Sequence, residues 1–148
     1  MFMEYVDPSE YTEYTVDAYF NLQGQLKCLV PRERLVVRAG EVNQGITDKG
    51  EVYRALKDRL SAIDEQLGLR GCITFQFFFN KYSHRIIGIE VNPRFGGGYP
   101  LTFEAKGNYS EYIIKEYLLS QTHTEFIDDW EDKYLMLRYD AAFFTKQE

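Results

Sequence analysis

The sequence predicts an α+β fold in which helices pack on one face of a mainly antiparallel sheet. Two apolar, β-branched and aromatic runs, residues 72–79 and 85–92, are joined by a polar turn, which is typical of an antiparallel hairpin. Between the N-terminal strands and this hairpin, apolar residues recur at helical spacing, at Val52, Leu56, Leu60, Ile63 and Leu67. Strand-like and helical stretches alternate without internal repeats over 148 residues, which is the length of one domain.

The N-terminal third predicts three strands. Residues 13–21 and 25–31 flank a turn that contains glycine, and residues 34–38 form the third strand. The stretch 38–47 is expected to be a loop. Arg38 either binds an anion there or is an exposed arginine on an edge strand, and the sequence does not decide between the two.

The helices are predicted from their end signals. Asp48 followed by Glu51 resembles a capping box, and Gly68 ends the helix that starts there. Ser110 is expected to cap a second helix. A final strand is expected over residues 135–144.

The central hairpin sorts its side chains by polarity, because alternate residues of a strand face opposite sides. Pairing Phe79 with Arg85 gathers one apolar face, made of Ile73, Phe75, Phe77, Ile87, Ile89 and Val91. The other face collects Thr74, Gln76, Gly88, Glu90 and Asn92. A slip of one residue would mix the two sets, so the pattern predicts this register, with Phe77 opposite Ile87.

The polar face of the hairpin carries groups suited to a metal and a charged substrate. Gln76, Glu90 and Asn92 offer the hard oxygen ligands that Mg²⁺ prefers. Arg94 follows with a planar fork that fits phosphate or carboxylate. A solvated strand face explains most isolated Glu-x-Asn sequences, but here the same segment also contains Arg94 and the glycines 96–98. The coincidence favours a binding site.

Gln76, the fourteen-residue step to Glu90 and the sequence Glu90-Val91-Asn92-Pro93-Arg94 resemble the metal-binding end of the ATP-grasp superfamily. The resemblance is to the large chain of carbamoyl-phosphate synthase and its short relatives. It implies that Gln76 and Glu90 bind two Mg²⁺ (or Mn²⁺) ions that bridge the phosphates of ATP, and that Asn92 binds the second ion. It also implies that Asn92 and Arg94 are catalytic, with Arg94 contacting the phosphates or the acyl phosphate.

The N-terminal residues extend the resemblance toward the nucleotide. Met3-Glu4-Tyr5-Val6 is similar to the hinge that binds adenine, which implies nucleotide contacts at Glu4 and Val6. Glu13 matches a glutamate that holds the ribose hydroxyls. The lysine-bearing N-terminal lobe and its preceding domain have no counterpart in this sequence. Residues 1–148 are therefore expected to be the C-terminal lobe of an ATP-grasp domain, inactive when alone.

The resemblance implies that the full-length parent is a carbamoyl-phosphate-synthase-like ligase. Such an enzyme uses ATP to convert a small carboxylate or bicarbonate into an acyl phosphate, which it joins to an amine or ammonia. Two alternatives stay open: a noncatalytic nucleotide-binding or oligomerisation module, and an ATP-grasp ligase for amino acids or other carboxylates. A homodimer is compatible with each of these functions.

Composition restricts partners and location. The net charge of −6, from 17 basic and 23 acidic residues, argues against nonspecific binding to nucleic acid. The sequence has no apolar run of ~18 residues and no secretory signal pattern, so no membrane partner and a cytoplasmic location are expected. Cys28 and Cys72 lack metal-site spacing and are expected to be buried free thiols.

Overall fold

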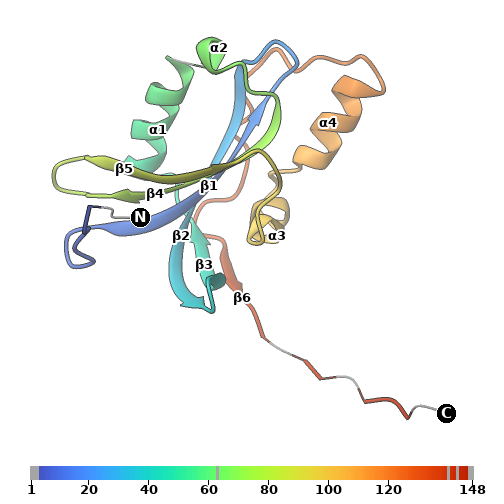
Figure 1. The fold of residues 1–148 in the computed structure, drawn as a ribbon. Coiled ribbons are helices and arrows are strands. Elements are labelled where there is room, and N and C mark those ends of the chain that lie inside the picture. The colour runs from blue at the N-terminus through green and yellow to red at the C-terminus, as the bar shows by residue number, and fades with distance from the viewer. Residues whose placement is uncertain (1–3, 63, 140, 143, 147–148) are drawn as a thin grey trace.

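The computed structural model describes residues 4–62, 64–139, 141–142 and 144–146 (Figure 1). In this part of the chain a six-stranded sheet has the order β5-β4-β1-β2-β3-β6, with every neighbouring pair antiparallel. The strands are β1 (Thr12–Phe20), β2 (Leu26–Arg38), β3 (Glu41–Thr47), β4 (Gly71–Phe79), β5 (Ile86–Asn92) and β6 (Leu135–Leu137). The helices are α1 (Glu51–Ser61), α2 (Asp64–Leu67), α3 (Tyr99–Glu104) and α4 (Tyr109–Tyr117). The predicted α+β class with an antiparallel sheet is confirmed.

The helices lie on both faces of the sheet, whereas the sequence predicted a single covered face (Figure 1). Alternation along β1 sends Val16 to one face and Asp17 to the other. On the first face, Leu56 of α1 and Val16 line the same apolar pocket. On the second face, Thr102 of α3 donates to the Asp17 carboxylate and Tyr109 of α4 donates to the Asp17 carbonyl. The helices supply hydrogen-bond donors to Asp17, whose buried charge needs such partners because it is removed from water.

The β4–β5 hairpin has a different register from the predicted one. Asn80, not Phe79, closes the turn: its N–H donates to the Arg85 carbonyl, and its side chain accepts from two N–H groups of the loop. Phe77 therefore faces Gly88 instead of Ile87. A bulge between Gln76 and Phe77 then changes the register again.

The bulge brings the two polar side chains of the hairpin closer than expected. Gln76 pairs directly with Glu90, and Thr74 pairs with Asn92. The predicted register would have placed Gln76 opposite Gly88, with Glu90 one diagonal step away. Directly opposed residues lie about 4.5–5.5 Å apart at Cβ, against about 7–8 Å for diagonal ones.

Strand β2 continues through both of the strands predicted at 25–31 and 34–38. It pairs with β1 through Glu33 and with β3 through Arg38, and the second pairing contains two irregularities. The segment expected to be a loop at 38–47 is therefore mostly strand β3. The short chain reversal at Ala39 and Gly40, both at positive φ, allows β3 to return along β2.

The helix ends also differ from the sequence signals. Asp48 does not cap α1, because its carboxylate accepts hydrogen bonds from Tyr14, Gly50 and Lys133. The predicted long helix is divided into α1 and α2, and Ile63 lies outside the described residues. Asn108, not Ser110, caps α4 by accepting from the Glu111 N–H.

The C-terminal strand is shorter than predicted. Strand β6 covers Leu135–Leu137, and within 138–144 the described residues are not in strand. The strand pairs with β3, and the next residue, Arg138, donates its N–H to the Asn43 carbonyl. Positions 140 and 143 of the predicted strand lie outside the described residues.

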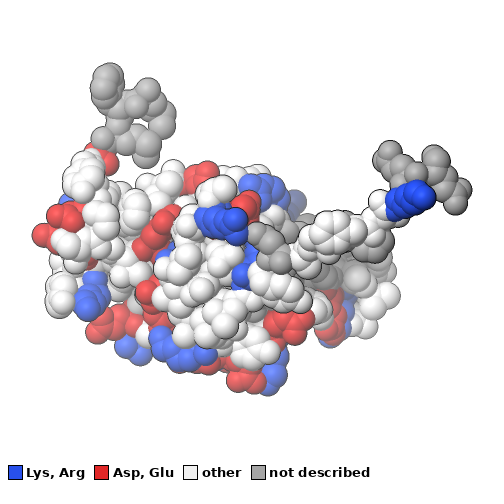
Figure 2. Space-filling view, turned by 90° about the horizontal axis from the view of Figure 1, so that it is seen from below, with Lys and Arg blue, Asp and Glu red and all other residues white. Residues whose placement is uncertain are grey.

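The core follows β1, β2 and β4 and is rich in aromatic side chains. Cys28 and Cys72 are buried and free, as predicted. No helix in the described part of the chain is long and apolar enough to cross a membrane. Figure 2 shows acidic and basic side chains interspersed over the face in view, without one extended basic patch.

Candidate functional site

One sheet face gathers polar side chains from four adjacent strands. Register places Thr15 of β1 between Arg32 of β2 and Gln76 of β4, and Arg34 Nη1 lies 3.3 Å from Glu13 Oε1 at the end of this pairing. Because pairing is in register and side chains alternate, these residues share one face. A pocket of about 120 Å³ opens on it. Its lining is Thr15, Arg32, Arg34, Gly40, Glu41, Val42, Thr74, Gln76, Glu90, Asn92, Arg94 and Gly96–Gly98.

The structure brings together the three residues expected to bind metal. Asn92 Nδ2 donates to Glu90 Oε1 at 2.9 Å, and Gln76 pairs with Glu90 across the strands. Gln76 Nε2 in turn donates to Glu13 Oε1 at 2.5 Å. Glu90 is exposed while Gln76 is half-buried, so the group is open to solvent on one side. Their role as metal ligands stays a prediction.

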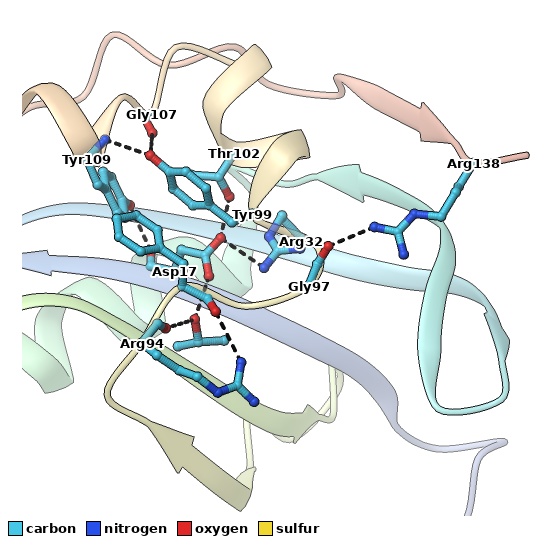
Figure 3. A network of polar contacts seen from close by, with 11 residues as sticks. Asp17, Arg32, Arg94, Gly97, Tyr99, Thr102, Gly107, Tyr109 and Arg138 are labelled. Carbon is cyan, nitrogen blue, oxygen red and sulfur yellow. Dashed lines mark hydrogen bonds and ion pairs between the residues drawn. The ribbon is translucent and has the colours of Figure 1, made fainter.

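Arg94 lies just beyond the end of β5, at the rim of the same pocket (Figure 3). Its backbone is held in place, since its N–H donates to the Asn92 carbonyl at 2.8 Å and its carbonyl lies 2.9 Å from Thr74 Oγ1. The side chain is exposed and donates to the neighbouring Phe95 carbonyl at 3.1 Å. A held backbone with an exposed guanidinium suits a residue that binds an anion.

Asp17 anchors the helices to this face, a role that was not predicted. Its carboxylate is fully buried and accepts from Thr102 at 2.6 Å and from Thr74 at 2.9 Å. Arg32 Nη2 lies 2.9 Å from the same carboxylate (Figure 3). The Tyr109 hydroxyl donates to the Asp17 carbonyl at 2.9 Å. An aspartate inside an apolar strand is the sequence signal that could have marked it.

A second layer of contacts holds α3 and α4 together. The Tyr99 hydroxyl donates to the Gly107 carbonyl at 3.1 Å and accepts from the Tyr109 N–H at 2.9 Å (Figure 3). Burial raises the pKa of both phenols, and that of Tyr109 most strongly, so both stay protonated donors. The helices that follow the glycine turn are thereby fixed to the sheet.

The glycine turn that links β5 to α3 packs closely on β2 and β3. A Cβ at Gly98 would lie 1.9 Å from Arg32 Nη1, and one at Gly97 would lie 2.5 Å from Glu41 Oε2. Arg138 Nη2 donates to the Gly97 carbonyl at 2.7 Å (Figure 3). Glycine is required at 98 because the guanidinium of Arg32 occupies the space of a side chain.

The other predicted nucleotide contacts are placed less tightly. Glu13 lies beside the pocket, between Gln76 and Arg34, whose Nη1 is 3.3 Å away. Glu4 is exposed and pairs with Arg85, before the start of β5, at the far end of the hairpin from Asn92. Val6 is half-buried, and Met3 lies outside the described residues.

Sequence reasoning missed two arginines and singled out a different one. Arg32 and Arg34 line the central pocket, whereas Arg38 lines a separate one with Arg138. The signal was present as alternation: Arg32 and Arg34 are two apart on one strand, so they share a face. It could be used only once β2 was known to pair with β1.

The donor set fits a magnesium ion that is partly held by a nucleotide. In the described residues, no three His, Cys, Asp or Glu side chains lie together so that they could hold a metal ion. A metal here would depend on Glu90, the amide oxygens of Gln76 and Asn92, phosphates and water. Mg²⁺ is commonly held in this way, by one or two carboxylates and substrate phosphates.

Solved structures share this fold at low sequence identity. The biotin carboxylase subunit of a pyruvate carboxylase matches with a TM-score of 0.66 and 14% identity, over 85% of this chain and 29% of that one. The biotin carboxylase domain dimer of the Hydrogenobacter thermophilus 2-oxoglutarate carboxylase, in complex with MgADP, ADP and bicarbonate, matches with a TM-score of 0.64 and 12% identity, over 88% and 29%.

Biotin carboxylase from Campylobacter jejuni, in a β,γ-ATP complex, matches with a TM-score of 0.61 and 17% identity, over 76% of this chain and 26% of that one. This chain therefore spans between a quarter and a third of the length of these three structures. No curated protein matches the chain.

The fold is thus that of the carboxylase domains which bind ATP or ADP in these structures. Residues 1–136 match the family described as ATP-grasp in the biosynthetic pathway with Ter operon, and the chain belongs to this ATP-grasp family. The predicted resemblance to the ATP-grasp superfamily is confirmed.

Proposed function

We propose that this chain is the ATP- and magnesium-binding half of an ATP-grasp ligase that activates a carboxylate or bicarbonate and joins it to an amine or ammonia. The observation that carries the proposal is the direct pairing of Gln76 with Glu90, beside Asn92 and Arg94, on one polar sheet face. Family membership supports the nucleotide, and the bicarbonate in the Hydrogenobacter thermophilus structure supports the class of acid.

Each residue has a proposed part in binding. Glu90, Gln76 and Asn92 hold Mg²⁺ (or Mn²⁺), which supplies positive charge to the phosphates of ATP when bound. Arg94 contacts the phosphates or the acyl phosphate, where its guanidinium offsets developing negative charge. Glu13 is the candidate for the ribose hydroxyls.

The hinge contacts complete the proposed nucleotide site. We place the adenine edge near the backbone of Glu4 and Val6, at the far end of the hairpin. Glu4 lies beside Arg85, which precedes β5. Glu90 follows four residues into the strand, and four to five residues of strand span about 13–17 Å. That separation is of the size needed to place a base and a triphosphate at opposite ends of one nucleotide.

The chemistry needs no nucleophilic side chain. An oxygen of the acid attacks the γ-phosphate of ATP, ADP leaves, and the acyl phosphate is captured by the amine with release of phosphate. The protein positions the reactants and stabilises charge, which is how phosphoryl-transfer enzymes generally work. With bicarbonate and ammonia this reaction gives carbamate and phosphate. Carbamoyl phosphate, which the sequence resemblance favours as the product, then requires a second ATP to phosphorylate the carbamate.

The proposal is tested in a protein that pairs this chain with an ATP-grasp N-terminal lobe. ADP release is measured with bicarbonate or small carboxylates, with and without ammonia or amines, in Mg²⁺ and in Mn²⁺. Acid-dependent ADP release that disappears in Glu90→Gln and persists in Glu65→Gln, an exposed carboxylate of α2, is the expected result. Equal activity of the two variants would contradict the proposed site.

A further inference from the structure

Two arginines of β2 line the pocket but have no part in the proposed binding of metal or phosphate. Arg32 and Arg34 are two residues apart on one strand face, so their Cα atoms are about 7 Å apart. Both line the 120 Å³ pocket that also contains the glycine turn. Arg32 is 2% exposed, and the side chain of Arg34 is 9% exposed.

Both guanidinium groups are only partly engaged. Arg32 Nη2 is paired with Asp17, and Arg34 Nη2 donates to the Gly40 carbonyl at 2.9 Å. The Nε atoms of both arginines are buried and have no hydrogen-bond partner among the described residues. Buried N–H donors are nearly always satisfied in folded proteins, so unsatisfied donors on two residues that line one pocket show that both arginines have hydrogen-bonding capacity left for an acceptor.

The two arginines are fixed before any ligand arrives. Asp17 Oδ2 lies 2.9 Å from Arg32 Nη2, and Glu13 Oε1 lies 3.3 Å from Arg34 Nη1. Gly98 leaves space for Arg32 Nη1 because a Cβ at that position would overlap it. A fixed guanidinium loses less freedom on binding, and its planar fork matches the geometry of a carboxylate.

We propose that Arg32 and Arg34 bind the acid substrate through its carboxylate-type oxygens, separately from Arg94 and the metal-binding residues. This inference rests on the proposed ligase function and adds the residues that recognise the acid. The ligand is a planar oxyanion, either bicarbonate or the carboxylate of a small organic acid. The small pocket volume favours bicarbonate or one acidic end of a larger molecule. Arg32 and Arg34 are thus substrate-binding residues that select the acid.

The arginine pair and the proposed metal-binding residues lie on different strands of the same sheet face. Gln76, Glu90 and Asn92 lie on β4 and β5, whereas the arginine pair lies on β2, with Thr15 of β1 between them. An acid bound by Arg32 and Arg34 would therefore lie beside the phosphates of ATP, on the same face of the sheet. Two reactants held at adjacent sites react as if at high effective concentration.

The test follows the Nε–Hε resonances of the arginines by ¹H–¹⁵N NMR in this 148-residue chain, which contains the whole pocket. Sodium bicarbonate, acetate and succinate are titrated in turn, and inorganic phosphate is the comparison ion. Saturable shifts of Arg32 and Arg34 with at least one of the three acids are expected. Arg34→Gln should weaken that binding by about tenfold, since it removes a charged hydrogen-bond donor.

One matched control and one conditional variant accompany Arg34→Gln. Arg54→Gln removes an exposed arginine of α1 on the other face and should leave acid binding unchanged. Arg32 is tied to the buried Asp17, so Arg32→Lys is used only if thermal unfolding shows that it folds like the parent. If Arg32→Lys does not fold like the parent, the test rests on Arg34→Gln alone.

The outcomes separate this inference from the proposed function. Acid binding that depends on Arg34 and survives Glu90→Gln supports the acid subsite, even if ligase activity is never found. Unmoved Nε–Hε resonances overturn the subsite, even if the Glu90-dependent ADP release is found. Phosphate binding that is tighter than binding of all three acids also overturns it, because the pair would then be part of the nucleotide site.

Discussion

Asp17 and Glu90 are carboxylates on the same face of the same sheet, but their surroundings are opposite. Asp17 is fully buried, with an arginine at 2.9 Å and hydroxyl donors from Thr74 and Thr102. Glu90 is exposed, and its hydrogen bond among the described contacts comes from Asn92, two residues away. One carboxylate is satisfied by the fold, and the other is left open to a ligand.

The difference shows how one sheet face serves two purposes. At the Asp17 end, α3 and α4 cover the polar face, so its charges stabilise the helices on the sheet. At the Glu90 end the polar pocket is lined by strands and the glycine turn, and no residue of a described helix is among its lining residues. A charge that is paired inside the fold supports stability, whereas an exposed charge at the sheet edge costs little to keep and is free to bind.

Asp17→Asn should have the largest effect on stability. It leaves the buried guanidinium of Arg32 without a counter-charge, which typically costs ~3–5 kcal/mol of unfolding free energy. Urea unfolding followed by circular dichroism measures the loss. The double variant Asp17→Asn/Arg32→Met should recover part of it, since both charges are then removed. A loss below about 1 kcal/mol would mean that the pair is not needed for folding.

Glu90→Gln should show the reverse pattern. The side chain is exposed, so the unfolding free energy should change by no more than about 0.5 kcal/mol. In a protein with a complete nucleotide site, turnover should fall by about 10²–10³-fold, as is typical when one well-placed electrostatic group is removed. Parallel measurement of ADP release and urea midpoint tests both parts. Normal turnover at saturating Mg²⁺ would remove Glu90 from the site.

Gly98→Ala tests how closely the glycine turn packs against Arg32 of β2 and Val42 of β3. The added Cβ would overlap Arg32 Nη1 and approach Val42 Cγ1 at 2.9 Å, and such overpacking typically costs ~1–3 kcal/mol. Gly88→Ala is the matched control, because a Cβ there meets no atom of the described structure within 4 Å. Thermal unfolding should separate the two variants clearly. Equal stability would show that Arg32 moves aside without cost.

Asp48 is a third carboxylate, and the loss of its ion pair with Lys133 should have the smallest effect on the unfolding free energy. It is 9% exposed, and although burial raises its pKa, hydrogen bonds from Lys133, Gly50 and Tyr14 lower it overall. A carboxyl whose pKa is lower when folded stabilises the protein fully above its unfolded pKa of about 3.9. That stabilisation is lost as the pH falls through the folded value.

Lys133→Met should flatten this pH dependence. Lys133 is largely exposed, so the loss at neutral pH should be no more than about 1 kcal/mol. Urea midpoints measured from pH 7 down to pH 3 should converge for the two proteins as Asp48 becomes protonated. Midpoints that stay a constant distance apart would mean that Lys133 acts through packing and not through charge.

Much of the fold could be predicted from local patterns. The alternation around Gln76 and Glu90 indicated a hairpin with one polar face, and the helical spacing from Val52 indicated α1. The details that failed depended on competing hydrogen bonds. Asn80 closed the turn in place of Phe79, and Asp48 bonded Tyr14 across the chain instead of capping a helix.

The sequence by itself determined the antiparallel class, the two-residue spacing that puts Glu90 and Asn92 on one side of their strand, and membership of the ATP-grasp superfamily. These follow from short-range spacing, because strand alternation and motif spacing are properties of neighbouring residues. Only the tertiary structure decided that Asp17 pairs with Arg32 and that Arg32 and Arg34 face the same pocket. Those facts depend on which strands lie side by side, and strand order is set by the packing of the whole domain and not by any local segment.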